Sequence, residues 1–225
     1  MTLAPAACVA DVRAELGEGP VWVAAEQALY WVDIRSPRLF RLSDAEGVRT
    51  IAVERPVCSL LPRASGGFIG GSHEGFIALS EDFAIQLLHD PEPHLPGNRF
   101  NDAKVDRAGR LWAGTMDHAE REPSGSLYRL HPDFACERID DGYRITNGPA
   151  FSRDGRVMYH TDSARQTVYA FDLGEDGEVG ERRVHLTFGE GEGYPDGMTV
   201  DAEDCLWIAF WDGWSVRRFS PAGER

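Results

Sequence analysis

Three oxygen-bearing side chains recur at one position of a repeating pattern. Glu18, Asn147 and Asp196 each lie ten or eleven residues before an apolar, aromatic segment, and each is followed directly by glycine. In a repeat protein, equivalent positions of the sequence occupy equivalent places in the fold. A glycine after each side chain permits close backbone approach or an unusual φ. We therefore expect these three side chains to converge on a common centre.

Two carboxylates and one amide carbonyl form a set of hard oxygen ligands. Such a set suits Ca²⁺, Mg²⁺, Mn²⁺ or Fe²⁺, and Zn²⁺ less well because no His or Cys contributes. Three protein ligands leave coordination positions open for water and substrate, as a catalytic metal site requires. The alternative is that each residue only ends a turn, as Asn and Asp commonly do. For three residues in one register we favour a site for one divalent cation.

A fourth oxygen-bearing residue in the same register, Asn101, belongs to the segment Asn-Arg-Phe-Asn-Asp at 98–102. Arg99 presents a planar fork of donors, so Arg99 and Asn101 suit a hydroxylated or anionic substrate. Asp102 is expected only to bond the backbone. His160 lies within an apolar segment and is expected in the core. Since the chain has no G-x-S-x-G motif, metal-assisted hydrolysis is favoured over covalent catalysis.

The elements that carry these residues repeat about every 40 to 50 residues. The aromatic segments begin at Leu29, Phe68, Leu111, Met158 and Leu206, and later strands follow at Leu39, Phe76, Leu127, Val168 and Val216. Several short strands in such a period are typical of a β-propeller blade. We expect an all-β chain with five repeats, the fifth ending after its third strand, and an extra N-terminal strand from Cys8 to Leu16.

The amino-acid composition limits the kinds of binding partner and the cellular location expected for the protein. The chain has 225 residues, is 42% hydrophobic and carries a formal charge of −14, which opposes binding to nucleic acid or to an anionic membrane. Its four cysteines are widely spaced with no C-x-x-C pair, so a reducing compartment is expected. The first ten residues lack the basic start of a signal peptide, and no apolar run reaches the ~18 residues of a membrane span. These features predict a cytoplasmic protein.

Five motifs together resemble one known family, that of senescence marker protein, gluconolactonase and luciferin-regenerating enzyme, which includes regucalcin. The motifs are Gly-Glu-Gly-Pro-Val-Trp at 17–22, Asn-Arg-Phe-Asn-Asp at 98–102, Gly-Arg-Leu-Trp-Ala-Gly-Thr-Met at 109–116, Ile-Thr-Asn-Gly at 145–148 and Pro-Asp-Gly-Met at 195–198. They span nearly the whole chain in the family's order. The runs 145–149 and 159–162 look most like bacterial aldonolactonases, including xylonolactonase-type enzymes.

The resemblance implies a six-bladed β-propeller with one divalent metal held by Glu18, Asn147 and Asp196. It also implies substrate contacts from Arg99 and Asn101. The family uses a further acidic residue from the loop found here at 116–124, for which we choose Glu120, with Asp117 and Glu122 as alternatives. With six blades, residues 1–225 would be one propeller domain incomplete at its C-terminus, from a protein of roughly 280 to 300 residues.

We expect this protein to hydrolyse a sugar 1,4- or 1,5-lactone, of gluconolactone or xylonolactone type, to its aldonic acid. In this carboxylic ester hydrolase, Asp196 would assist the attacking water as metal ligand or base. Two other functions stay open. One is a metal-binding or partner-binding propeller without turnover, because such folds often serve as scaffolds. The other is a related metal-dependent esterase or phosphotriesterase.

Overall fold

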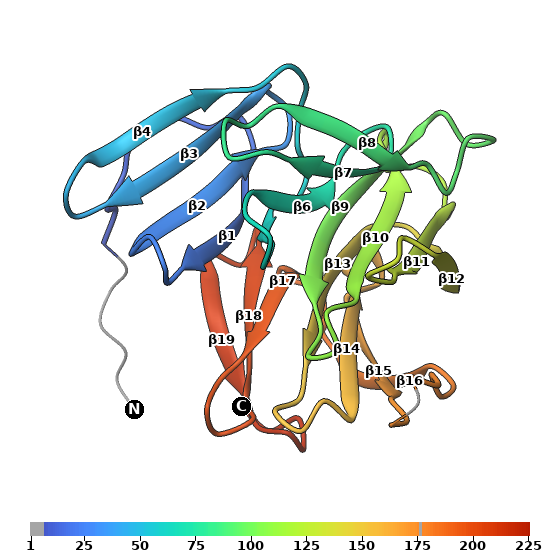
Figure 1. Ribbon diagram of the computed structural model, residues 1–225. Coiled ribbons are helices and arrows are strands. Elements are labelled where there is room, and N and C mark those ends of the chain that lie inside the picture. The colour runs from blue at the N-terminus through green and yellow to red at the C-terminus, as the bar shows by residue number, and fades with distance from the viewer. Residues whose placement is uncertain (1–6, 176) are drawn as a thin grey trace.

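The computed structural model describes residues 7–175 and 177–225, and the chain is built almost entirely of β-strands (Figure 1). The strands form five antiparallel sheets in which each strand pairs with the next one in the sequence. One short 3₁₀ helix, η1 (Ser163–Arg165), interrupts them. The prediction of an all-β propeller is confirmed.

The first three sheets have four strands each, and the third sheet carries two of the sequence-predicted motifs. They comprise β1 (Gly17–Val23), β2 (Ala28–Asp33), β3 (Arg38–Ser43) and β4 (Gly47–Ala52); β5 (Leu61–Pro62), β6 (Phe68–Gly71), β7 (Phe76–Leu79) and β8 (Ile85–His89); and β9 (Asn98–Val105), β10 (Leu111–Asp117), β11 (Gly125–Leu130) and β12 (Cys136–Tyr143).

The fourth sheet also has four strands, whereas the fifth has three. They comprise β13 (Thr146–Phe151), β14 (Val157–Asp162), β15 (Thr167–Asp172) and β16 (Arg183–Thr187); and β17 (Tyr194–Val200), β18 (Leu206–Trp211) and β19 (Ser215–Phe219). The predicted aromatic segments coincide with β2, β6, β10, β14 and β18, and the later strands with β3, β7, β11, β15 and β19. Both predicted ladders are therefore confirmed.

The first strands of successive sheets lie side by side, β5 with β9, β9 with β13, and β13 with β17. The sheets consequently follow one another around a common centre (Figure 1). The described residues contain five blades, and the sixth blade implied by the resemblance is not confirmed.

The N-terminal strand predicted from Cys8 to Leu16 is wrong, because that segment has no strand pairing. Val9 is exposed rather than packed. The backbone N–H groups of Glu15 and Leu16 donate instead to the buried carboxylate of Asp33, at 2.9 and 3.0 Å. A side chain thus takes the place of a neighbouring strand.

Apolar side chains fill the space within and between the sheets. Phe40, Trp112 and Leu206 are fully buried on three different blades. His160 is also fully buried and stacks on Tyr143 with 4.8 Å between ring centroids, so its prediction as a core residue is confirmed. Among the described residues, no helix is long and apolar enough to cross a membrane.

Candidate functional site

A local irregularity in three first strands sets the position of the metal-ligand candidates. The pairing register of β1 shifts between Glu18 and Val21, and that of β13 shifts between Asn147 and Ala150. The register of β17 shifts at the bulge that contains Asp196. Such bulges re-aim a side chain and occur next to active sites. The recurring register in the sequence is therefore a recurring bulge in the structure.

Two buried aspartates hold the chain just before two of these bulges. Asp33, at the end of β2, accepts from the backbone before Glu18, as described above. Asp162, at the end of β14, accepts from the backbone N–H groups of Arg144 and Ile145 at 3.1 and 3.4 Å. Both carboxylates hydrogen-bond the backbone just before a bulge. They therefore help to position the candidate ligand that follows, Glu18 or Asn147. Sequence reasoning missed these two residues.

A chain of hydrogen bonds joins the substrate-binding candidates to Asn147. Nη1 of Arg99 donates to Oδ1 of Asn101 at 2.7 Å. Nδ2 of Asn101 then donates to the Thr146 carbonyl at 2.7 Å and to Oδ1 of Asn147 at 3.0 Å. The contact with Thr146 fixes which end of the Asn101 amide donates. All these side chains are buried, so the structure brings Arg99, Asn101 and Asn147 together.

The other end of the Asn147 amide is held as well. Nδ2 of Asn147 donates to the Ser163 hydroxyl at 2.9 Å, and that hydroxyl donates to the Pro195 carbonyl at 2.6 Å. Asn147 is therefore oriented with its oxygen toward Asn101, and a second lone pair on that oxygen stays available. Ser163 also links the fourth and fifth sheets next to Asp196. No sequence signal pointed to Ser163, because it lies in η1 outside the repeating strands.

Three carboxylates share this buried region. Burial raises the pKa of Glu18, and the charges of Asp196 and then Asp102 raise it further. Burial also raises the pKa of Asp196, and it raises the pKa of Asp102 to about 6. Asp102 accepts from the backbone N–H groups of Ala103 and Gly148, at 2.8 and 3.0 Å, as expected of a backbone-bonding residue. Neighbouring carboxylates repel one another, and a bound cation would relieve this repulsion.

The donor set fits a divalent cation. Within residues 7–175 and 177–225, Glu18 and Asp196 each accept only from the N–H of the glycine that follows, at 3.3 and 2.9 Å. Their remaining oxygens are open. In the same ranges, no group of three or more His, Cys, Asp or Glu side chains lies close enough to hold a metal ion. The third candidate ligand is an amide oxygen, that of Asn147, and a group of this kind does not include Asn.

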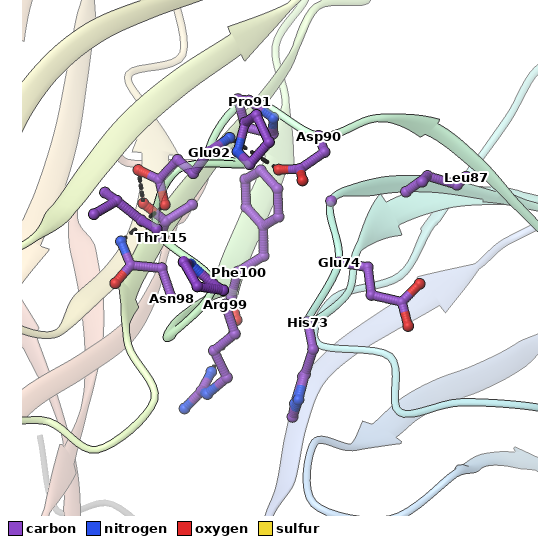
Figure 2. A pocket seen from close by; sticks show the side chains of 14 residues that line it. His73, Glu74, Leu87, Asp90, Pro91, Glu92, Asn98, Arg99, Phe100 and Thr115 are labelled. Atoms are coloured by element: carbon purple, nitrogen blue, oxygen red, sulfur yellow. Dashed lines mark hydrogen bonds between the residues drawn. The ribbon is translucent and has the colours of Figure 1, made fainter.

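Some of these residues line two cavities. The larger, with a volume of about 930 Å³, lies between the first and fifth sheets and is lined by Glu18, Asp102 and Asp196, with Trp22 and Trp211 on its apolar walls. The smaller, of about 290 Å³, is lined by Arg99 together with His73 and Glu92 (Figure 2). Arg99 lines the smaller cavity, and its charge also lowers the pKa of Glu18, which lines the larger one.

The acidic substrate-binding candidates lie at the end of β10 and in the loop that follows it. Glu120 is exposed, has a φ of 60° and lines neither cavity in the part of the chain that the structure describes. The Asp117 carboxylate accepts from three backbone N–H groups of the same loop, those of Ala119, Arg121 and Glu122. Asp117 therefore shapes the loop, and Glu120 does not contact Arg99 in this arrangement.

The family described as SMP-30/Gluconolactonase/LRE-like region matches residues 16–225. The chain belongs to this family. A 6-deoxy-6-sulfogluconolactonase from Pseudomonas putida is 36% identical over 220 residues, which cover 96% of this chain and 76% of that protein. Regucalcin from Bos taurus is 37% identical over 228 residues, covering 97% of this chain and 76% of the relative.

Solved structures give the same result. A regucalcin from Agrobacterium tumefaciens, described as a calcium-binding protein, aligns with a TM-score of 0.87 and 27% identity, covering 93% of this chain and 72% of the other. A luciferin-regenerating enzyme aligns with a TM-score of 0.85 and 31% identity, covering 93% and 73%. The resemblance stated from the motifs is confirmed, and the chain spans about three quarters of the length of these relatives.

Proposed function

We propose that this protein hydrolyses a sugar lactone to the aldonic acid, using one divalent cation held by Glu18, Asn147 and Asp196. The observation that carries this proposal is the joining of the two residue sets. The oxygen of Asn147 is oriented by Asn101, which is itself bonded to Arg99. One candidate ligand for the cation and two candidate donors for a polar substrate thus form one connected unit. Relatives named for lactonase activity support the same reaction.

Each residue has a role in this reaction. A divalent cation in such a site supplies Lewis-acid polarisation of the lactone carbonyl and activation of water. Arg99 and Asn101 bind and orient ring hydroxyls of the substrate, and Asp196 orients the attacking water and accepts its proton. Glu120 is proposed to contact the substrate from the loop between β10 and β11.

The experiment is acid release in a pH-stat from gluconolactone and xylonolactone, with and without a chelator. The proposal requires hydrolysis that the chelator abolishes and that an added divalent cation restores. Absence of metal-dependent acid release from every aldonolactone would refute the proposal. Lactones without ring hydroxyls should be much poorer substrates, whereas a general esterase would retain its rate on them.

A second candidate function is binding of a metal without turnover. It is favoured by the relatives named regucalcin and by the similar structure described as a calcium-binding protein. In that case a cation binds at Glu18, Asn147 and Asp196, while replacement of Arg99 and Asn101 leaves the function of the protein intact. Calcium binding without hydrolysis of any lactone would support this candidate.

We also propose that a sixth sheet closes the ring between β1 and the fifth sheet. Trp22, Trp211 and Val216 line that cleft and are 54%, 63% and 55% exposed, and exposed apolar patches of this kind mark surfaces that another element covers. Adding one blade should raise the thermal midpoint and increase lactone hydrolysis. A 225-residue form that is monomeric, unfolds cooperatively and is fully active would favour a compact five-bladed ring.

We also propose that the protein acts in the cytoplasm. All four cysteines, at positions 8, 58, 136 and 205, are free thiols. This state is ordinary in a reducing compartment, which supports the cytoplasm as the place where the protein acts. Thiol titration of protein purified without reductant tests this, because a disulfide formed in the cell would oppose it.

A further inference from the structure

The smaller cavity contains two buried polar atoms whose hydrogen-bonding capacity is unused. Within the described part of the chain, Nε2 of His73 and Nε of Arg99 are buried and have no hydrogen-bond partner. Both residues line this cavity, and their side chains extend in the same direction, away from Glu92 and Asp90 (Figure 2). Buried polar groups in proteins nearly always have partners. Two unpaired groups on one cavity therefore indicate the polar groups of a ligand.

The chemistry of His73 defines what it offers. Burial lowers the pKa of the His73 imidazole, and the charges of Arg99 and His118 lower it further, so the ring is neutral near pH 7. The backbone of Ile34 favours the protonated form of the ring. In a neutral imidazole one ring nitrogen donates a hydrogen bond and the other accepts one. Nε2 of His73 thus offers either an N–H or a lone pair near a guanidinium that offers an N–H.

A sugar hydroxyl both accepts and donates a hydrogen bond, so it can pair with the Arg99 donor and with Nε2 of His73 in either tautomer. An anionic group can pair with His73 only where the ring donates, and Glu74 adds a negative charge near that ring. The pair therefore favours a neutral hydroxyl over a carboxylate, phosphate or sulfonate.

The walls of the cavity hold these two residues in place. The buried carboxylate of Glu92 accepts from Nδ2 of Asn98 at 2.8 Å, and from the hydroxyls of Thr115 and Tyr128 at 3.0 Å each. These bonds fix the start of β9 immediately before Arg99. A tight turn holds His73, since the N–H of Ser72 donates to the Gly75 carbonyl at 2.9 Å. The pair is thus built into two rigid segments before any ligand binds.

We propose that His73 is a specificity-determining residue, which forms a hydrogen bond with a substrate hydroxyl lying beside Arg99. This inference rests on the proposed lactonase function. It adds a contact from the second blade, and it assigns to the smaller cavity the part of the sugar farther from Glu18 and Asp196.

The test compares His73→Phe, which removes the hydrogen-bonding nitrogen, with His73→Gln, whose amide can donate or accept a hydrogen bond. Each is assayed on gluconolactone and on a panel of lactones that each lack one hydroxyl. His73→Phe should raise KM for gluconolactone roughly tenfold, as expected for loss of one hydrogen bond from a polar site, with little change in kcat. For the one analogue that lacks the matched hydroxyl, wild type and His73→Phe should have the same KM.

His94→Phe is the matched control, because His94 is exposed and does not line the cavity, and it should behave as wild type. A fall in kcat/KM of the same size for every lactone, or no change in KM for any, would overturn the role of His73. A result in which His73→Gln is as impaired as His73→Phe would do so too.

Binding of D-glucitol, a polyol that cannot be hydrolysed, separates this inference from the proposed function. If wild type hydrolyses no lactone but binds glucitol, and His73→Phe abolishes that binding, the proposed function fails while the hydroxyl site stands. If wild type hydrolyses lactones and His73→Phe binds glucitol as well as wild type does, the hydroxyl site fails and the proposed function stands. Calorimetry measures the binding in each case.

Discussion

Nδ2 of Asn101 donates a hydrogen bond to Oδ1 of Asn147 across 3.0 Å, from the third blade to the fourth. Asn101 is a candidate substrate contact and Asn147 a candidate metal ligand, so this bond makes the two roles interdependent. It also fixes the direction in which the Asn147 oxygen points. Partners that orient a ligand in this way typically change metal affinity 10- to 100-fold when they are removed.

Asn101→Ala should therefore weaken metal binding as well as substrate binding. The substitution leaves Asn147 free to rotate, so we expect roughly a tenfold loss of metal affinity, measured by calorimetry in the absence of any lactone. Gln166→Ala is the control, since the Gln166 amide also donates to backbone carbonyls, those of Gly189 and Gly193, but does not contact the metal-ligand candidates. Equal metal affinity in Asn101→Ala and wild type would show that Asn147 is oriented without Asn101.

Asp196→Asn should lower turnover without lowering the stability of the fold. The Asp196 carboxylate accepts only the local N–H of Gly197 among the described residues, and its charge opposes that of Glu18. Removing the charge relieves this repulsion, so we expect the thermal midpoint of the metal-free protein to be unchanged or raised. Turnover should fall about 100-fold or more, because water and metal both lose a partner. Fold and activity lost together would instead favour Asp196 as a structural turn residue.

Ser163→Ala should destabilise the junction between the fourth and fifth blades. The substitution leaves Nδ2 of Asn147 and the Pro195 carbonyl without their shared partner, which typically costs about 1–3 kcal/mol of unfolding free energy. Denaturant unfolding measures this loss. Ser163→Thr, which retains the hydroxyl, should recover most of the stability, and Ser65→Ala in an exposed turn should have no effect. No loss in Ser163→Ala would mean that water replaces the hydroxyl.

His160 should make the protein less stable in mild acid. Burial, followed by the charge of Arg182, lowers the pKa of His160 to about 3 in the folded chain, against 6.5 for an ordinary histidine. Below pH 6.5 the unfolded chain therefore binds a proton that the folded chain does not. Folding stability falls as the pH decreases from 6.5 toward 3, by about 1.4 kcal/mol for each pH unit at most.

The measurement for His160 is denaturant unfolding at a series of pH values. His160→Phe keeps a ring against Tyr143 and should flatten the dependence between pH 6.5 and 4, whereas His94→Phe at an exposed position should not. If the wild type and His160→Phe curves run parallel, other groups account for the acid sensitivity.

The sequence predicted most of the blades because their second and third strands carry aromatic and aliphatic residues at a steady period. It did not predict the fourth strands, since an outer strand such as β4 is largely exposed and has little apolar pattern. The segment from Cys8 to Leu16 has some alternation, yet its backbone bonds a buried carboxylate. A tertiary contact of this kind produces no periodic pattern in the sequence of the segment.

The candidate ligands Glu18, Asn147 and Asp196 were found from their register because a bulge recurs in the first strand of each of their blades. His73 and Ser163 were not found, because they lie in connections between strands, where residue spacing varies from blade to blade. Only the folded chain shows that Ser163 bonds Asn147 and that His73 lines a cavity together with Arg99. Residues on loops of a repeat fold are therefore the part of a site that periodicity does not predict.

Stoichiometric restoration of activity tests the central claim most directly. Wild-type protein is stripped with a chelator, and hydrolysis of gluconolactone is then measured as each divalent cation is added in known amounts, with bound metal determined by elemental analysis. We predict that activity rises in proportion to bound metal and saturates at one ion per chain, and that Asp196→Asn gains no activity from the same additions. Full hydrolysis by the metal-free protein would contradict the account.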